Sequence, residues 1–357
     1  MTNVLPLPDF SHERVEVVTG SRSGLIVTAA VHSSVLGSAL GGARLWTYPS
    51  WTDALGDALR LSAAMTLKNA AAGLDAGGGK SVIALPPGTV LDAERRRAAF
   101  LDLGDVVESL GGLYRTAEDV GSTTDDMLVV SERTDHVVGL PESGGGSGEP
   151  AGPTSLGVYA SLIATLERVT GVADVADRRV TIAGLGQVGG RLAVRLAAEG
   201  ARLTVTDVDP AKRSLAAELG AAWVEPHEAH LIAADVFVPA GIGGVLTDEV
   251  IDVLDARAVC GPANNPLADR SGAERLAERG VLYAPDFVVN AGGVIYLDLA
   301  AKHRASRDEI MTRVAGIGDT LRRIFDDADL RGVTPLAAAE AVAAQRLSAS
   351  ARTDALV

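Results

Sequence analysis

The spacing of apolar residues predicts alternating strands and helices in the first part of the chain. Residues 14–48 hold short apolar runs separated by polar and glycine positions, a pattern typical of strands. Apolar residues recur at roughly helical spacing over 51–66, which predicts a helix leading into Lys68. Residues 80–85 read as a buried strand ended by prolines, and residues 92–110 as an amphipathic helix. This part of the chain is therefore expected to be a mixed α/β region.

The pattern changes between residues 142 and 153, which are rich in glycine, serine and proline. This segment is either an exposed loop or the hinge between two domains. A helical pattern covers 155–169, and strands then alternate with helices over 179–291, as in a parallel sheet with crossover helices. Residues 306–327 place their apolar side chains on one helical face, and a last helix is predicted over 335–348.

Length and composition narrow the class of protein. The 357 residues are long for one domain and comfortable for two, and 47% of them are hydrophobic. A net charge of −14 argues against a nucleic-acid partner. The chain has no apolar stretch long enough to span a membrane and no pattern of a signal peptide. Its single cysteine, Cys260, fits a reducing cytoplasm.

Lysine is unevenly distributed. Only four of the 32 basic residues are lysine, and two of them, Lys68 and Lys80, bound one thirteen-residue stretch. Lysine gives up its proton when it is desolvated or near other cations, whereas arginine does not. The glycines before Lys80 also permit close approach of backbone to a ligand. These residues alone fit a titratable amine in a site, and equally two exposed lysines beside a flexible turn.

A dinucleotide-binding signature follows the first strand of the second half. Gly184, Gly186 and Gly189 form a G-x-G-x-x-G motif between a strand and a helix, and Asp207 ends the next strand 18 residues after Gly189. The glycines allow a tight turn, contact with a pyrophosphate and close packing of helix on strand. The alternative is a glycine-rich turn of an unrelated α/β domain. The complete context favours a dinucleotide, and Asp207 favours NAD over NADP, although Arg213 lies close in sequence.

Three polar positions are further candidates for a site. Asp119 follows a strand and precedes a glycine, which suits a general acid or base and also an ordinary helix cap. Asn264 and Asn290 are expected to close strands, where side-chain amides face ligands in open α/β folds but also form turns. The histidines show no ligand spacing, so no metal site is predicted.

Together the motifs resemble the amino-acid dehydrogenase superfamily, which includes glutamate, leucine, valine and phenylalanine dehydrogenases. The resemblance extends from Gly41 to about residue 340. Its carriers are Leu40-Gly41-Gly42-Ala-Arg44, Met65-Thr-Leu-Lys68-Asn69, Gly77-Gly-Gly-Lys80, Thr116-Ala-Glu-Asp119-Val-Gly, Gly184-Leu-Gly-Gln-Val-Gly189, Ala263-Asn264-Asn265 and Pro285-Asp-Phe-Val-Val-Asn290-Ala-Gly-Gly.

The resemblance implies a set of catalytic roles. Lys68 would bind the substrate α-carboxylate with backbone N–H groups near Gly41 and Gly42. Lys80 would be the general base that activates water, with a pKa lowered towards about 7–8 by burial and by the charge of Lys68. Asp119 would carry protons to and from the substrate nitrogen. The products would be a 2-oxo acid and ammonia.

The resemblance also implies how the ligands are held. Asn290 would help to hold the substrate. The cofactor would be NAD, bound by Gly184, Gly186, Gln187, Val188, Gly189, Asp207, Ala240 and Asn264. The partners would be this cofactor and small molecules, with no nucleic acid and no membrane, in a cytoplasmic homo-oligomer.

The side-chain pocket is expected to be apolar. Glutamate dehydrogenases of this superfamily have a lysine where this chain has Leu40, and a buried substrate carboxylate against Leu40 would be unpaired. The other positions that match the family's pocket are Met65, Ala117, Val138, Val294 and Leu297. A branched-chain L-amino acid is therefore the predicted substrate. Phenylalanine or a specialised aromatic or non-proteinogenic amino acid is the alternative, and a non-catalytic dinucleotide-binding protein a remote one.

The predicted fold follows from the motifs and the resemblance. It is an α/β protein of two domains with a cleft between them. An N-terminal α/β substrate domain covers 1–141, the hinge 142–153, and a Rossmann NAD-binding domain 154–329. The C-terminal helices, about 330–357, would pack back on the substrate domain.

Overall fold

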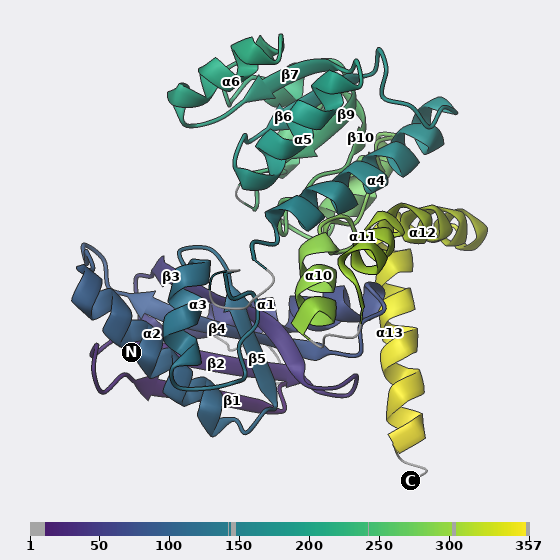
Figure 1. The fold of residues 1–357 in the computed structure, drawn as a ribbon. Helices are drawn as coiled ribbons and strands as arrows, with labels where there is room; N and C mark the ends of the chain where they lie inside the picture. The colour runs from purple at the N-terminus through teal and green to yellow at the C-terminus, as the bar shows by residue number, and fades with distance from the viewer. Residues whose placement is uncertain (1–10, 142, 144–147, 242, 302–304, 355–357) are drawn as a thin grey trace, which may run out of the picture. The chain divides into compact units, whose positions relative to one another are not determined.

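The computed structural model describes residues 11–141, 143, 148–241, 243–301 and 305–354 (Figure 1). The chain forms two compact units. The first unit comprises the described residues within Met1–Glu149, Leu297–Ala305 and Ala343–Val357, and the second unit comprises those within Pro150–Tyr296 and Ser306–Val342. Both units are α/β, so the predicted fold class is confirmed.

The first unit is built on a mixed five-stranded sheet of order β1-β2-β4-β3-β5. β2 pairs antiparallel with β1 and β4, whereas β3 pairs parallel with β4 and β5. The strands are β1 (Arg14–Thr19), β2 (Ile26–Ser33), β3 (Ala39–Thr47), β4 (Gly77–Leu85) and β5 (Tyr114–Glu118).

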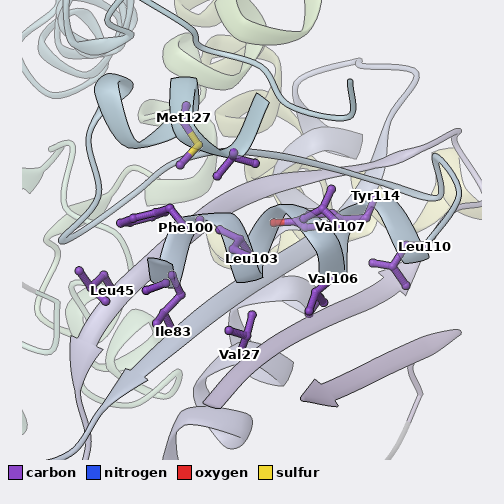
Figure 2. Close-up of a cluster of buried hydrophobic side chains, with 14 of the residues drawn as sticks. Val27, Leu45, Ile83, Phe100, Leu103, Val106, Val107, Leu110, Tyr114 and Met127 are labelled. Carbon is purple, nitrogen blue, oxygen red and sulfur yellow. The ribbon is translucent and has the colours of Figure 1, made fainter. Parts of the chain in front are cut away.

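Helices cover both faces of this sheet, and the alternation of side chains along each strand decides which face each residue joins. Ile83 of β4 lies in one apolar cluster with Phe100 of α2 (Ala93–Ser109), shown in Figure 2. Its neighbour Val82 lies in a second cluster with Leu59 of α1 (Trp51–Ala71). Because side chains alternate along a strand, Lys80 points to the same face as Val82. The sheet thus directs Lys80 to the face covered by α1.

One of the glycines before Lys80 serves helix packing. Gly78 lies inside β4, and a Cβ added there would lie 2.1 Å from Oγ1 and 2.2 Å from the backbone nitrogen of Thr66 on α1. Only glycine leaves room for this helix–strand approach. The close neighbour of this backbone is therefore helix α1, not a flexible turn.

The second unit is a doubly wound domain on an all-parallel sheet of order β11-β10-β9-β6-β7-β8. Its strands are β6 (Arg179–Ala183), β7 (Arg202–Thr206), β8 (Ala222–Trp223), β9 (Ala234–Pro239), β10 (Ala256–Val259) and β11 (Leu282–Tyr283). Helix α4 (Ala151–Thr170) packs on β9, β10 and α5 (Gln187–Ala198).

The remaining helices are short or lie near the C-terminus. They are α3 (Thr124–Ser131), α6 (Arg213–Glu218), α7 (Asp248–Val253), α8 (Gly272–Glu278), α9 (Asp286–Val289), α10 (Gly292–Ala301), α11 (Arg307–Ala315), α12 (Ile317–Arg331) and α13 (Pro335–Asp354), with 3₁₀ turns at Pro210–Lys212 and Ala229–Leu231. The helix expected over 306–327 is thus two consecutive helices, α11 and α12, which meet at Gly316. No helix in the described part of the chain is long and apolar enough to cross a membrane.

Three segments differ from the sequence-based expectation. Of the predicted hinge, residues 142 and 144–147 lie outside the described residues, and Ala151 already begins α4. Contacts assign the C-terminal chain to the first unit only from Ala343, inside α13. The prediction of a strand directly before Asn290 is wrong. A helical turn begins at Pro285 instead, and the Pro285 carbonyl accepts hydrogen bonds from the N–H groups of Val288 and Val289.

Candidate active site

The last turn of α1 carries Lys68 and is fixed to the sheet by its neighbour. Asn69 is fully buried, and its Nδ2 donates to the carbonyl of Leu40 at 3.2 Å and to that of Gly77 at 2.6 Å. These bonds tie the helix to β3 and β4 at once. Lys68 itself is half-buried on this anchored turn.

The two glycines after Leu40 pair with β5 but lie between the two stretches of β3 that pair with β4. Pairing with β4 covers Ala39 and Leu40 and resumes at Ala43. The hydroxyl of the fully buried Tyr114 donates to the carbonyl oxygen of Gly41 at 3.0 Å. Because that carbonyl and the N–H of Gly42 belong to one planar trans peptide, fixing the carbonyl also directs the N–H to the opposite side. This backbone is thus held in a defined orientation.

Lys80 and Asp119 form a buried ion pair. The Lys80 Nζ lies 2.9 Å from Asp119 Oδ1, and Lys80 is only 4% exposed. Burial lowers the pKa of the Lys80 amine, and the negative charge of Asp119 opposes that shift. The largest cationic contribution to the lowered pKa comes from Arg44, where Lys68 was expected. The prediction of a depressed pKa stands, but its main cationic source is different.

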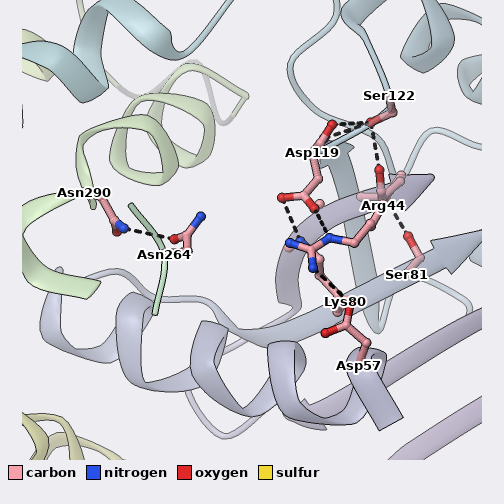
Figure 3. Close-up of polar contacts among 12 residues, drawn as sticks. Arg44, Asp57, Lys80, Ser81, Asp119, Ser122, Asn264 and Asn290 are labelled. Carbon is pink, nitrogen blue, oxygen red and sulfur yellow. Dashed lines mark hydrogen bonds and ion pairs between the residues drawn. The ribbon is translucent and has the colours of Figure 1, made fainter. Parts of the chain in front are cut away.

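The carboxylate of Asp119 is held ionised by two cations. Burial alone would raise its pKa, but the charges of Lys80 and Arg44 outweigh that effect and lower it to about 2. Its backbone N–H donates to Ser122 Oγ at 2.8 Å, and that hydroxyl donates to the carbonyl of Ala43 at 2.7 Å. The turn after β5 is therefore tied to β3, which places the carboxylate beside Lys80 (Figure 3).

The predicted pocket residues are mostly buried in the first unit. Leu40, Ala117, Val138 and Leu297 are each at most 7% exposed. The Val138 N–H donates to the carbonyl of Thr116 at 2.8 Å, which places Val138 beside β5. Of the remaining predicted residues, Met65 and Val294 are half-buried, and Val294 belongs to the second unit.

The glycine motif of the second unit has the geometry of a phosphate-binding turn. Gly184 has φ of +118°, and a Cβ there would lie 2.7 Å from the carbonyl carbon of Ala240. Gly186 is the N-cap of α5, and within the described residues no side chain caps that N-terminus. A Cβ on Gly186 would meet no atom within 4 Å, so space is open at the helix end. The free N–H groups, which begin at Gln187 and Val188, suit a pyrophosphate.

Asp207 joins the end of β7 to this turn. Its Oδ2 accepts a hydrogen bond from the Leu185 N–H at 2.6 Å, and its Oδ1 accepts one from the Asp209 N–H at 2.8 Å. Each carboxylate oxygen keeps a further lone pair for a ribose hydroxyl. Arg213 is paired with Glu225, at 2.5 Å between Nη2 and Oε1.

The two asparagines predicted from the sequence are in direct contact. Asn290 Nδ2 donates to Asn264 Oδ1 at 2.9 Å and to the carbonyl of Pro262 at 3.1 Å (Figure 3). The Asn290 Oδ1 atom is buried and has no hydrogen-bond partner among the described residues. A buried acceptor without a donor is costly, so a ligand N–H or O–H is its natural partner.

Sequence reasoning missed the roles of Arg44, Asp57 and Tyr114. Arg44 was noted only as part of a motif, although a charged residue inside an otherwise apolar strand must find a buried partner. Asp57 lies 13 positions after Arg44 in sequence, so only the packing of α1 on the sheet reveals the pair. The described residues contain no group of three side chains able to hold a metal ion.

Comparison with known proteins gives a consistent result. Residues 11–136 match the family described as "Glu/Leu/Phe/Val dehydrogenase, dimerisation domain", and residues 204–354 match "Glutamate/Leucine/Phenylalanine/Valine dehydrogenase". A leucine dehydrogenase of Bacillus cereus is 38% identical over 96% of this chain and 92% of its own length. A valine dehydrogenase of Streptomyces albus is 41% identical over 94% of this chain and 92% of its own length.

Solved structures also resemble this fold. The crystal structure of L-tryptophan dehydrogenase from Nostoc punctiforme superposes with a TM-score of 0.79 at 35% identity. The match covers 96% of this chain and 97% of that one.

Proposed function

The chain belongs to the glutamate/leucine/phenylalanine/valine dehydrogenase family, and on that premise we propose that it oxidatively deaminates an L-amino acid with an apolar, branched side chain. It is an amino-acid dehydrogenase that uses a nicotinamide dinucleotide. The buried Lys80–Asp119 ion pair is the observation that carries the proposal, because a desolvated amine beside a carboxylate is the arrangement that a general base and a proton carrier require.

The proposed reaction converts amino acid, oxidised dinucleotide and water into 2-oxo acid, ammonium, reduced dinucleotide and a proton. The cofactor supplies the hydride acceptor. Lys68 pairs with the substrate carboxylate, which also accepts from the backbone N–H of Gly42. Hydride loss leaves an imino acid, and Lys80 Nζ removes a proton from the water that attacks it. Asp119, held ionised, accepts and returns protons at the substrate nitrogen.

The residues assigned to the second unit would hold the cofactor and one edge of the substrate. The N–H groups at the start of α5 and the open space at Gly186 support a pyrophosphate there. Asn264 would contact the nicotinamide end. The unpartnered Oδ1 of Asn290 would accept a hydrogen bond from the bound substrate.

We propose NAD in preference to NADP. The carboxylate of Asp207 stands beside the glycine turn and would repel a 2′-phosphate. Arg213, the cation close to it in sequence, is engaged with Glu225 and lies over the ring of Trp223. A kcat/KM at least about ten-fold higher with NAD than with NADP is expected, since a repulsion of this kind amounts to about 1.4 kcal/mol or more.

Burial of the apolar pocket residues supports the proposed substrate class. Leu40 is 1% exposed and Ala117 3%, so a substrate carboxylate against them would lose its hydration without gaining a partner. Phenylalanine or a specialised aromatic amino acid is the second candidate, and the resemblance to a tryptophan dehydrogenase structure favours it. A cytoplasmic homo-oligomer is also proposed, supported by the single buried cysteine and by the match to a dimerisation domain.

The test is NADH formation from a panel of L-amino acids at alkaline pH. The panel holds valine, leucine, isoleucine, phenylalanine, tryptophan and glutamate. Turnover of the branched-chain members with glutamate silent is the expected result. Turnover of aromatic members alone would keep the reaction and overturn the substrate class. Silence across the panel with intact NADH binding would contradict the proposed reaction.

A further inference from the structure

Arg44 joins the catalytic ion pair to a second carboxylate. Its Nε donates to Asp119 Oδ2 at 3.0 Å, and its Nη1 donates to Asp57 Oδ2 at 2.9 Å (Figure 3). The three side chains are between 13% and 17% exposed. Arg44 comes from β3, Asp57 from α1 and Asp119 from the turn after β5. The guanidinium therefore links three separate elements at the site.

Asp57 is itself fixed on Arg44. Its Oδ2 also accepts from the Tyr48 hydroxyl at 2.6 Å, and its Oδ1 accepts from Arg60 Nη2 at 2.5 Å. Tyr48 and the charges of Arg44 and Arg60 lower the pKa of Asp57 although burial raises it. Asp57 thus stays ionised and balances the charge of Arg44. A planar guanidinium between two carboxylates has little freedom to rotate.

Both oxygens of Asp119 are consequently occupied. Oδ1 faces Lys80 Nζ at 2.9 Å and Oδ2 faces Arg44 Nε at 3.0 Å. Without Arg44, the carboxylate could rotate about its side-chain bonds and form a two-oxygen contact with Lys80. The full charge of Asp119 would then stabilise the protonated amine, which cannot act as a base.

We propose that Arg44 is a positioning residue for the proton transfers: it holds one oxygen of Asp119 away from Lys80 and keeps the amine available as a base. This inference rests on the proposed function. Two effects act in the same direction, since Arg44 shares the negative charge of Asp119 and also places a positive charge near Lys80. The opposing charge is Asp57, which favours protonated Lys80.

The charges that act on Lys80 agree with this arrangement. Burial lowers the pKa of Lys80 most, Asp119 opposes that shift, Arg44 lowers the pKa further and Asp57 raises it. The charged groups around the amine thus come from β3, α1 and the end of β5, and α1 also carries Lys68. Removal of Arg44 and removal of the Asp57 charge should therefore shift the Lys80 titration in opposite directions.

A purely structural role for Arg44 predicts a different outcome. The same contacts tie β3 to α1, and loss of that tie would lower stability and activity at every pH. It would not move the titration of Lys80 in a variant that keeps the positive charge, such as Arg44→Lys. The pH at which Lys80 loses its proton is therefore the readout that separates the two roles.

The experiment is a side-chain NMR titration of lysine labelled with ¹³C at Cε, supported by pH profiles of kcat/KM. The chain has only four lysines, so each signal can be followed, and Lys80→Ala identifies the signal of interest. In Arg44→Met the Lys80 midpoint should rise by about one pH unit. Asp57→Asn should lower it. Arg44→Lys, which keeps the charge but not the planar fork, should raise the midpoint less than Arg44→Met does and reduce kcat about ten-fold.

An unchanged Lys80 midpoint in a folded Arg44→Met variant would overturn the inference. If Arg44→Met does not fold, the Asp57→Asn variant provides the test. A Lys80 midpoint that rises or stays constant in Asp57→Asn would equally overturn the inference. The titration needs no substrate. If the wild-type protein oxidised no amino acid, the proposed function would be wrong. The titration would still show separately whether Arg44 controls the protonation of Lys80.

Discussion

The two units hold their functional groups in opposite ways. In the first unit the proposed functional groups are charged side chains, the buried Lys80 and the half-buried Asp119 and Arg44, each fixed by its neighbours. In the second unit the proposed groups are mainly backbone groups at Gly184 and the start of α5, together with the amides of Asn264 and Asn290 and one carboxylate, that of Asp207. The first arrangement depends on protonation state, whereas the second depends on the absence of side-chain atoms. The two units should therefore respond to different perturbations.

The largest effect is expected for Lys80→Ala, which removes the proposed base from the first unit. Turnover should fall by about 10³-fold, since general-base catalysis typically contributes that much. Affinity for NADH, measured by quenching of protein fluorescence, should stay within about two-fold of wild type because the dinucleotide motif belongs to the second unit. Lys80→Arg is the matched control, and it should be equally inactive because arginine keeps its proton. Substantial turnover in either variant would show that another group is the base.

Gly184→Val should produce the converse result in the second unit. The positive φ and the Cβ contact with Ala240 make any side chain at this position strained. NADH affinity should weaken by about 30-fold, equivalent to about 2 kcal/mol. Gly220→Ala is the control, since Gly220 also has a positive φ but open space around it. It should lower the melting temperature and spare NADH binding. An equal loss of NADH affinity in both variants would contradict the specific role of Gly184.

A smaller effect is expected for Tyr114→Phe in the first unit. The change removes the hydrogen bond to the Gly41 carbonyl, whose peptide carries the Gly42 N–H proposed to bind the substrate carboxylate. Loss of one such bond amounts to about 1 kcal/mol, so KM for the amino acid should rise about five-fold. Steady-state kinetics with each substrate varied in turn give the comparison. A higher KM for NAD with no change for the amino acid would disprove this assignment.

The same contrast explains what the sequence could predict. The dinucleotide turn is one contiguous segment, and its glycines, helix start and acidic residue are readable in order. The α/β class was likewise predicted from the spacing of apolar residues. The Asn290 position was read as the end of a strand because Phe287-Val-Val is apolar over too few residues to distinguish a strand from a helical turn.

The charged cluster of the first unit was less accessible. Lys80 and Asp119 were predicted from motifs, but Asp57 gave no signal because its partner Arg44 is on another element. The assignment of Lys68 as the cation near Lys80 followed from the resemblance to the family. Side chains alternate along β3, which places Arg44 on the face of the sheet that α1 covers. Arg44 is therefore the cation that lowers the pKa of Lys80.

The most direct test follows both units across one pH range. The proposed base is a lysine whose pKa lies below the ordinary 10.5, and only its neutral form accepts a proton. Between pH 7 and 10, kcat/KM for leucine at saturating NAD should therefore rise with pH and level off below 10.5, while the dissociation constant for NADH stays constant. A flat kcat/KM, or an NADH affinity that changes in parallel with it, would contradict the assignment of buried charge chemistry to the first unit and backbone binding to the second.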